Sequence, residues 1–249
     1  MNDSPRAGNE SSAFPAVCAE LPVPQRYVGS TLGTRFAIPP AMPRSPRPRR
    51  PGFNFGTWFV YDPATRQGGD GAFHPNSRFT PAKFSDGLSK TLCLAEVKAF
   101  TPYVRNTADP SSSYPAESPP SDAASVVGLA TGMSAGDTKL GSTLNDNTGH
   151  TEWPDGRVHP SGFTTPHPPN TRVPYQSGSM TYDFDLNSRQ EGNSATAKTF
   201  AAITSRSHHR GLVTVAMMDG SAATIADGVD ATVWRALSTR SGGESQQPP

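Results

Sequence analysis

The sequence of 249 residues has few of the features that mark disulfide-rich, membrane or strongly charged proteins. It contains only two cysteines, Cys18 and Cys93. They could pair in an oxidising compartment, but Cys93 lies in an apolar run, and we expect a buried thiol there. No apolar run approaches the length of about 18 residues that a membrane-spanning helix needs. The net charge of +1 gives no strong field for nucleic acid or a membrane surface, so neither is an expected partner.

Apolar residues are also scarce, at 34% of the chain, whereas glycine (23) and proline (26) are abundant. This composition favours short strands, turns and long loops over a helical bundle. A chain of this size still buries roughly 70–75% of its unfolded surface, so a substantial core is expected.

Residues 1–52 differ in composition from the rest. They hold seven arginines, no lysine and three acidic residues, and the basic charge peaks at residues 43–51. A contact with nucleic acid or an anionic surface is one interpretation. We favour a disordered or poorly packed basic arm. The charged start, apolar stretch and small-residue site of a signal peptide are not found, so no export signal is expected.

Residues 53–243 are predicted to form an α+β domain on an antiparallel sheet, followed by a tail at 244–249. The aromatic run 53–61 is typical of a strand. Residues 91–98 also indicate a buried strand, although a helix remains an alternative. An irregular insertion is expected at 107–147, with a short helix at 123–133.

The clearest pattern is a C-terminal β-hairpin. Asp219-Gly220 separates two β-prone runs, and this dipeptide favours a two-residue turn. Met218 would then pair with Ser221. In that register Val213, Val215 and Met217 share a buried face with Ala222, Thr224 and Ala226.

The same register places His209 opposite Asp230, and an ion pair between them is the preferred interpretation. His209 and Asp219 would be separated by about 33 Å of strand, too far to share one reacting atom. Asp230 could instead cap a helix whose apolar face is formed by Val229, Val233, Trp234 and Leu237, and which ends at Gly242-Gly243.

A second polar constellation contains His150, Glu152 and His159. With Asp155-Gly156 as a turn, Glu152 would lie opposite His159 and His150 opposite Ser161. The three side chains would then share one face, and two histidines with one carboxylate could bind zinc. A solvent-side ion pair with a neighbouring histidine is the favoured alternative, and we expect no metal and no cofactor.

His209, followed after nine residues by Asp219-Gly220, resembles the prepilin-type processing-associated motif of a large bacterial family of unknown function. Further blocks resemble that family in the expected order: residues 86–92 with 95–97, residues 150–159, and residues 234–243. The resemblance implies a pseudopilin-like, extracytoplasmic envelope protein with a C-terminal β domain. The N-terminal apolar helix usual in such proteins is not found in residues 1–52.

The expected function is therefore a non-catalytic structural or assembly component of the cell envelope, not an enzyme, with itself or other envelope proteins as partners. An extracytoplasmic binding module for a glycan, peptide or solute is the alternative. A metal-dependent hydrolase using His150, Glu152 and His159 is a weaker one.

Overall fold

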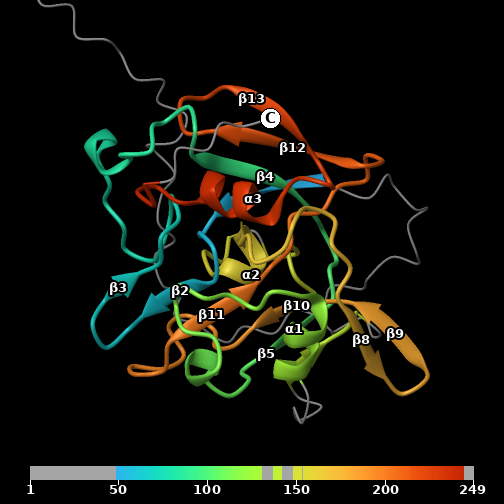
Figure 1. Ribbon diagram of the computed structural model, residues 1–249. Coiled ribbons are helices and arrows are strands. Elements are labelled where there is room, and N and C mark those ends of the chain that lie inside the picture. The colour runs from blue at the N-terminus through green and yellow to red at the C-terminus, as the bar shows by residue number, and fades with distance from the viewer. Residues whose placement is uncertain (1–48, 131–136, 142–147, 153, 244–249) are drawn as a thin grey trace, which may run out of the picture.

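The computed structural model describes residues 49–130, 137–141, 148–152 and 154–243, and these form two larger sheets and one separate hairpin (Figure 1). The first sheet has five strands in the order β13-β12-β4-β1-β7. They are β1 (Arg49–Asn54), β4 (Leu92–Lys98), β7 (Gly162–Phe163), β12 (Leu212–Met217) and β13 (Ala222–Ala226).

The second sheet has six shorter strands in the order β3-β2-β11-β10-β5-β6. They are β2 (Phe59–Asp62), β3 (Gln67–Gly68), β5 (Tyr103–Arg105), β6 (Thr138–Lys139), β10 (Asp185–Asn187) and β11 (Thr199–Ala202). The separate hairpin pairs β8 (Pro174–Ser177) with β9 (Met180–Asp183).

The helices are short, as the composition predicts. The α-helices are α1 (Ala123–Ala130), α2 (Val158–Ser161) and α3 (Ala231–Ser238), and the 3₁₀ helices are η1 (Pro81–Lys83) and η2 (Pro110–Ser112). Figure 1 shows α2 between the two sheets and α3 beside β4 and β12. The predicted α+β class, rich in strands with a C-terminal hairpin and helix, is confirmed.

The expectation of an antiparallel sheet is right for most strand pairs and wrong for two. β1 pairs with β7 in parallel, and β10 pairs with β5 in parallel. Parallel neighbours need a long connection between them, and the long loops of this chain supply it.

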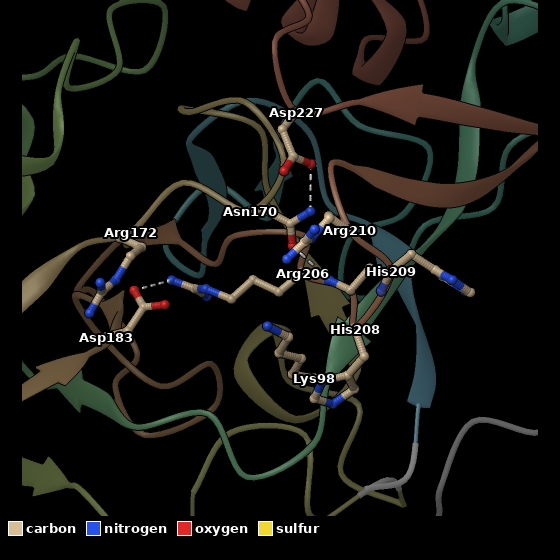
Figure 2. A pocket seen from close by; sticks show the side chains of 10 residues that line it. Lys98, Asn170, Arg172, Asp183, Arg206, His208, His209, Arg210 and Asp227 are labelled. Atoms are coloured by element: carbon tan, nitrogen blue, oxygen red, sulfur yellow. Dashed lines mark hydrogen bonds and ion pairs between the residues drawn. The ribbon is translucent and has the colours of Figure 1, made fainter. Parts of the chain in front are cut away.

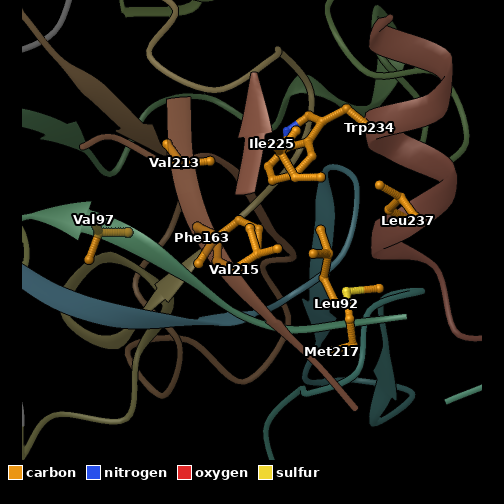
Figure 3. Packing of buried hydrophobic residues seen from close by; sticks show 10 residues of the cluster. Leu92, Val97, Phe163, Val213, Val215, Met217, Ile225, Trp234 and Leu237 are labelled. Atoms are coloured by element: carbon orange, nitrogen blue, oxygen red, sulfur yellow. The ribbon is translucent and has the colours of Figure 1, made fainter. Parts of the chain in front are cut away.

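The first core lies between the five-stranded sheet and α3 (Figure 3). Alternate residues of β12 point into it, and Phe163 of β7 stacks on Trp234 of α3 with ring centroids 6.1 Å apart. The residues buried there are Leu92, Ala95, Val97, Phe163, Val213, Val215, Met217, Ile225, Trp234 and Leu237.

Helix α3 confirms the predicted cap and apolar face. The Asp230 carboxylate accepts hydrogen bonds from the backbone N–H groups of Thr232 and Val233, which satisfies two donors of the first turn. Trp234 and Leu237 are buried, while Val229 and Val233 pack against them. The helix ends at Ser238, earlier than the predicted end at Gly242-Gly243.

A second group of apolar residues packs around the six-stranded sheet. Trp58, Phe184 and Phe200 are its large buried rings, and Val126 of α1 packs with them. A third cluster, with Phe55, Val60 and Ile203, joins β2 and β11 to α2. The core is therefore distributed over three clusters around small sheets.

The single strand expected at residues 53–61 is divided in two. β1 ends at Asn54, whose side-chain amide is buried and donates to the carbonyls of Leu92 and Ser238, both at 2.8 Å. The chain then turns at Gly56, which has φ of +98° and leaves no space for a Cβ. This turn allows β2 to enter the other sheet. Since β1 begins at Arg49, the predicted domain boundary at residue 53 falls inside a strand.

The other local predictions have mixed outcomes. Residues 92–98 form the strand β4, and Cys93 is buried there as a thiol. The helix expected at 123–133 is present as α1 up to Ala130. The arm at 1–48, the tail at 244–249 and Cys18 lie outside the described residues, as does part of the insertion at 107–147.

The C-terminal hairpin is confirmed, but its predicted register is wrong by one residue. The Met217 N–H donates to the Ser221 carbonyl at 2.8 Å, and the Gly220 N–H donates to the Met217 carbonyl at 3.0 Å. Gly220 has φ of +86°. The loop therefore contains Met218, Asp219 and Gly220, the common three-residue alternative to a two-residue turn.

This shift changes which side chains of β13 face the core. Val213 pairs with Ile225, and Ile225 is 2% exposed. The residues predicted to be buried, Ala222, Thr224 and Ala226, are exposed instead. The prediction for β12 holds, because Val213, Val215 and Met217 are buried.

Candidate functional site

The residues of the His209 to Asp219-Gly220 motif lie at opposite ends of the hairpin. Asp219 lies in the loop, where its Oδ1 accepts from the N–H and the hydroxyl of Ser221 at 2.9 and 2.7 Å. These bonds, the hydroxyl's first, lower the pKa of Asp219. His209 precedes β12, which begins at Leu212. The two motif residues therefore do not form one reaction site.

The predicted ion pair of His209 with Asp230 is wrong, because the two side chains have other neighbours. His209 Nε2 lies 3.5 Å from Oε1 of Glu96 on β4, while Asp230 caps α3. The other carboxylate oxygen of Glu96 accepts from the Thr214 N–H at 2.9 Å. Glu96 thus joins His209 and β12 to the middle of the five-stranded sheet.

The loop before β4 connects the hairpin loop to the C-terminal segment. The N–H groups of Met218 and Asp219 donate to the carbonyls of Thr91 and Leu88. The Asp86 carboxylate accepts from the N–H groups of residues 242 and 243, at 2.7 and 3.0 Å. Three segments that are far apart in sequence, the loop before β4, the hairpin loop and residues 242–243, are thus joined by hydrogen bonds.

Arg240 links the C-terminal segment to a further loop. Its Nη1 donates to the carbonyls of Gly69 and Gly71 at 2.5 and 2.8 Å, and its guanidinium lies 4.4 Å from the ring centre of Phe79. Burial lowers the pKa of Arg240, and nearby Asp70 opposes this shift. Arg240 therefore fastens the C-terminal segment to the loop after β3.

The constellation of His150, Glu152 and His159 does not form the predicted three-residue face. Residues 158–161 are the helical turn α2 and not a strand, and the His150 N–H donates to the His159 carbonyl at 3.1 Å. Both imidazoles are buried, whereas Glu152 is exposed. Among the described residues, no group of three histidine, cysteine, aspartate or glutamate side chains is placed to hold a metal ion.

The two buried imidazoles are held by neutral neighbours. His159 stacks on Tyr103 with ring centroids 4.7 Å apart, and its Nδ1 lies 3.1 Å from the amide nitrogen of Asn187. His150 Nδ1 lies 3.3 Å from the Pro160 carbonyl. Burial lowers the pKa of His150 to about 4 and that of His159 to about 3. Both are therefore neutral at pH 7.

Glu191 is a further buried ionisable group beside α2. Its Oε1 accepts from the Val158 N–H at 3.0 Å, and its backbone carbonyl accepts from Arg157 Nε at 2.9 Å. Burial raises the pKa of Glu191 to about 7, and the hydrogen bonds only partly oppose this. Glu191 anchors the start of α2 and hence the backbone around His159.

A polar cleft of about 470 Å³ opens next to His209 (Figure 2). It lies where the segment between β11 and β12 passes the end of β4 and the loop before β8. His208 and His209 contribute to its lining. Four basic side chains also line it, which are Lys98, Arg172, Arg206 and Arg210.

Acceptor groups line the same cleft. Asp227 Oδ1 accepts from the Asn170 side-chain NH2 group at 2.5 Å, and the side-chain Oδ1 of Asn170 accepts from the Ser207 N–H at 2.8 Å. Asp183 Oδ1 accepts from the Val173 N–H at 2.8 Å and from Arg206 Nη2 at 3.2 Å. The wall of the cleft is thus fixed by hydrogen bonds between four separate segments, which contain residues 170–173, 183, 206–207 and 227.

Arg206 is the buried part of this wall. Its side chain is 3% exposed and pairs with Asp183 at the cleft and with Asp185 behind it. Burial opposes the charge of the guanidinium, but the two carboxylates raise the pKa of Arg206 overall. Arg206 therefore stays charged and holds Asp183 in place.

A family model described as "Protein of unknown function (DUF1559)" matches residues 18–232. The chain belongs to this family. No curated protein and no solved structure has a significant match to the chain. The family description assigns no activity.

Within the described residues, no helix is long and apolar enough to cross a membrane. His209 stands out in the sequence as a motif residue, but the cleft beside it could not be predicted from the sequence. The one local signal was the run Ser207-His208-His209-Arg210. The other lining residues come from distant segments, and their proximity depends on the loops between strands.

Proposed function

We propose that this protein is a non-catalytic structural or assembly component of the bacterial cell envelope, of the pseudopilin-like kind. The observation that carries the proposal is the use of the motif residues in the fold. Asp219 and Gly220 form the hairpin loop, and His209 pairs with Glu96. The two motif residues lie at opposite ends of the hairpin, too far apart to act on one substrate atom, which favours a structural role for the motif over a catalytic one.

The prepilin-type resemblance supports the location in the envelope. In this proposal the blocks at 86–97 and 234–243 have a structural role, because they hold the hairpin loop and the C-terminal segment together.

The outer edge of β13 is the surface through which we expect assembly. β13 is the terminal strand of the five-stranded sheet within the described residues. Backbone hydrogen bonds from Met217 to Ser221 and from Asp227 to Gly211 determine which residues of β13 face β12. Residues 222, 224 and 226 therefore direct their backbone N–H and C=O groups away from β12. Their side chains are Ala, Thr and Ala, without the charges that commonly protect an edge.

Sedimentation velocity over a range of protein concentrations tests this proposal. Wild-type protein should show concentration-dependent self-association. Thr224→Pro should abolish it, since proline removes the outward N–H and leaves the inward bonds of residues 223 and 225. Thr224→Val is the matched control, because it keeps the N–H and the β-branched shape.

Two results would contradict assembly through this edge. One is a wild-type protein that stays monomeric at all concentrations. The other is a Thr224→Pro variant that associates as strongly as the Thr224→Val variant while both melt at similar temperatures.

A further inference from the structure

We propose that the cleft beside His209 binds a sugar-sized solute that carries a carboxylate or phosphate group. Its volume of about 470 Å³ lies within the range of about 300–1,000 Å³ typical of small-molecule sites. Its lining is mainly polar and combines basic side chains with carboxylates. This inference is independent of the proposed assembly function, because it uses a different surface.

The anionic group of the solute would bind to Arg172 and Arg210. Both side chains line the cleft and are exposed. Neither guanidinium has a carboxylate within ion-pair distance in the part of the chain that the structure describes. A planar guanidinium donates two parallel hydrogen bonds to a carboxylate or phosphate group, which favours these oxyanions over chloride.

The hydroxyl groups of the solute would bind to the two carboxylates of the cleft. Asp183 and Asp227 each use Oδ1 in hydrogen bonds to the protein. Within the described residues, Oδ2 of neither carboxylate accepts a hydrogen bond, so each can accept from a hydroxyl group of the solute. A simple inorganic anion has no hydroxyl groups to donate to these carboxylate oxygens and would leave them without a ligand partner. The lining therefore suits a ligand with both hydroxyl groups and a negative group.

The cleft is organised before any ligand binds. Arg206 fixes Asp183, and Asn170 holds both Asp227 and the Ser207 N–H. Side chains that are already ordered lose less conformational entropy on binding, which leaves more of the interaction energy for affinity. Figure 2 shows these groups arranged around the cleft from the loop before β8, β9, the segment before β12 and the loop after β13.

Isothermal titration calorimetry at low ionic strength tests the proposal with four probes. They are glucuronate, glucose 6-phosphate, glucose and inorganic phosphate. We expect glucuronate or glucose 6-phosphate to bind at least tenfold more tightly than glucose and inorganic phosphate. The stronger of the two anionic sugars identifies the oxyanion as a carboxylate or a phosphate group. Raising the salt to about 0.15 M should weaken binding several-fold, because screening acts over about 8 Å at that concentration.

Arg172→Gln and Arg210→Gln should each weaken the binding of the tighter-binding probe by about tenfold, since each removes a charge-assisted hydrogen-bonding group. Arg78→Gln, which removes an exposed arginine outside the cleft, is the matched control and should bind as the wild type does. Thermal melting of all variants checks that the substitutions leave the fold intact.

Several outcomes would overturn the proposal. The first is that neither anionic sugar binds, and the second is that glucose binds as tightly as the anionic sugars. The third is that the Arg78→Gln control loses as much affinity for the anionic sugar as the cleft variants do. Self-association of β13 is measured separately, so failure here leaves the assembly proposal to its own test.

Discussion

Glu191 is a buried carboxyl group whose ionisation should set part of the pH dependence of stability. Burial raises its pKa from 4.5 to about 7 in the folded protein. The folded state therefore binds its proton more tightly than the unfolded state does. Its contribution to stability is complete below pH 4.5 and is lost as the pH rises through 7. The loss from pH 5 to pH 8 amounts to about 2–3 kcal/mol, since one pKa unit corresponds to about 1.4 kcal/mol.

Glu191→Gln removes this titration while keeping an oxygen that can accept from the Val158 N–H. The amide group would also place a donor where Glu191 Oε2 has no hydrogen-bond partner among the described residues. An unsatisfied buried donor costs about 1–3 kcal/mol at every pH. The informative quantity is therefore how the difference in unfolding free energy between the variant and wild type changes from pH 5 to pH 8. Over this range the unfolding free energy of the variant should rise by about 2–3 kcal/mol relative to that of wild type.

Urea unfolding at pH 5 and pH 8 measures this difference. His150 and His159 titrate in both proteins, so their effect cancels in the comparison. Because their pKa values are lowered, to about 4 and about 3, they withdraw stability from both proteins as the pH falls below 6.5. Glu117→Gln, which makes the same substitution at an exposed position, is the matched control. A variant at Glu191 that differs from wild type by the same amount at both pH values would refute the reasoning.

Two further substitutions test the architecture. Asp86→Ala should lower the free energy of unfolding by about 1–3 kcal/mol, because it removes two hydrogen bonds to residues 242 and 243, whose donors are near water. Asp109→Ala, which removes a single cap bond, should lower it by less. Equal melting temperatures of these two variants would contradict the role of Asp86. Ile225→Ala should cost about 2–5 kcal/mol and Thr224→Ala about 0.5 kcal/mol or less in urea unfolding. The reverse order would mean that the register of β13 is wrong.

Features set by neighbouring residues could be predicted from the sequence. Asp230 caps α3 because its carboxylate reaches N–H groups two and three residues later, and the spacing of Trp234 and Leu237 places both on one helix face. The alternation of Val213, Val215 and Met217 likewise predicted the buried face of β12. These patterns need no knowledge of the rest of the chain.

Features set by distant segments could not be predicted. His150 and His159 are close through a backbone bond at a helical turn, and that turn is held by Glu191, which lies far along the chain. The partner of His209 is Glu96, on a strand far away in sequence. Asp-Gly at residues 155–156 suggested a hairpin, but the local signal was weaker than the tertiary contacts that form α2.

The error in β13 shows how much depends on one loop residue. Side chains of a strand alternate with a period of two, so a loop of three residues in place of two moves the whole strand to the opposite face. The turn preference of Asp219-Gly220 fits both loops, because glycine supplies the positive φ in each. The position of the large apolar side chain distinguishes the two loops. Within residues 222–226 only Ile225 has such a side chain. The three-residue loop buries Ile225, whereas the two-residue loop would expose it. Burying an isoleucine is worth about 1.5–3 kcal/mol, and that gain is sufficient to select the observed register.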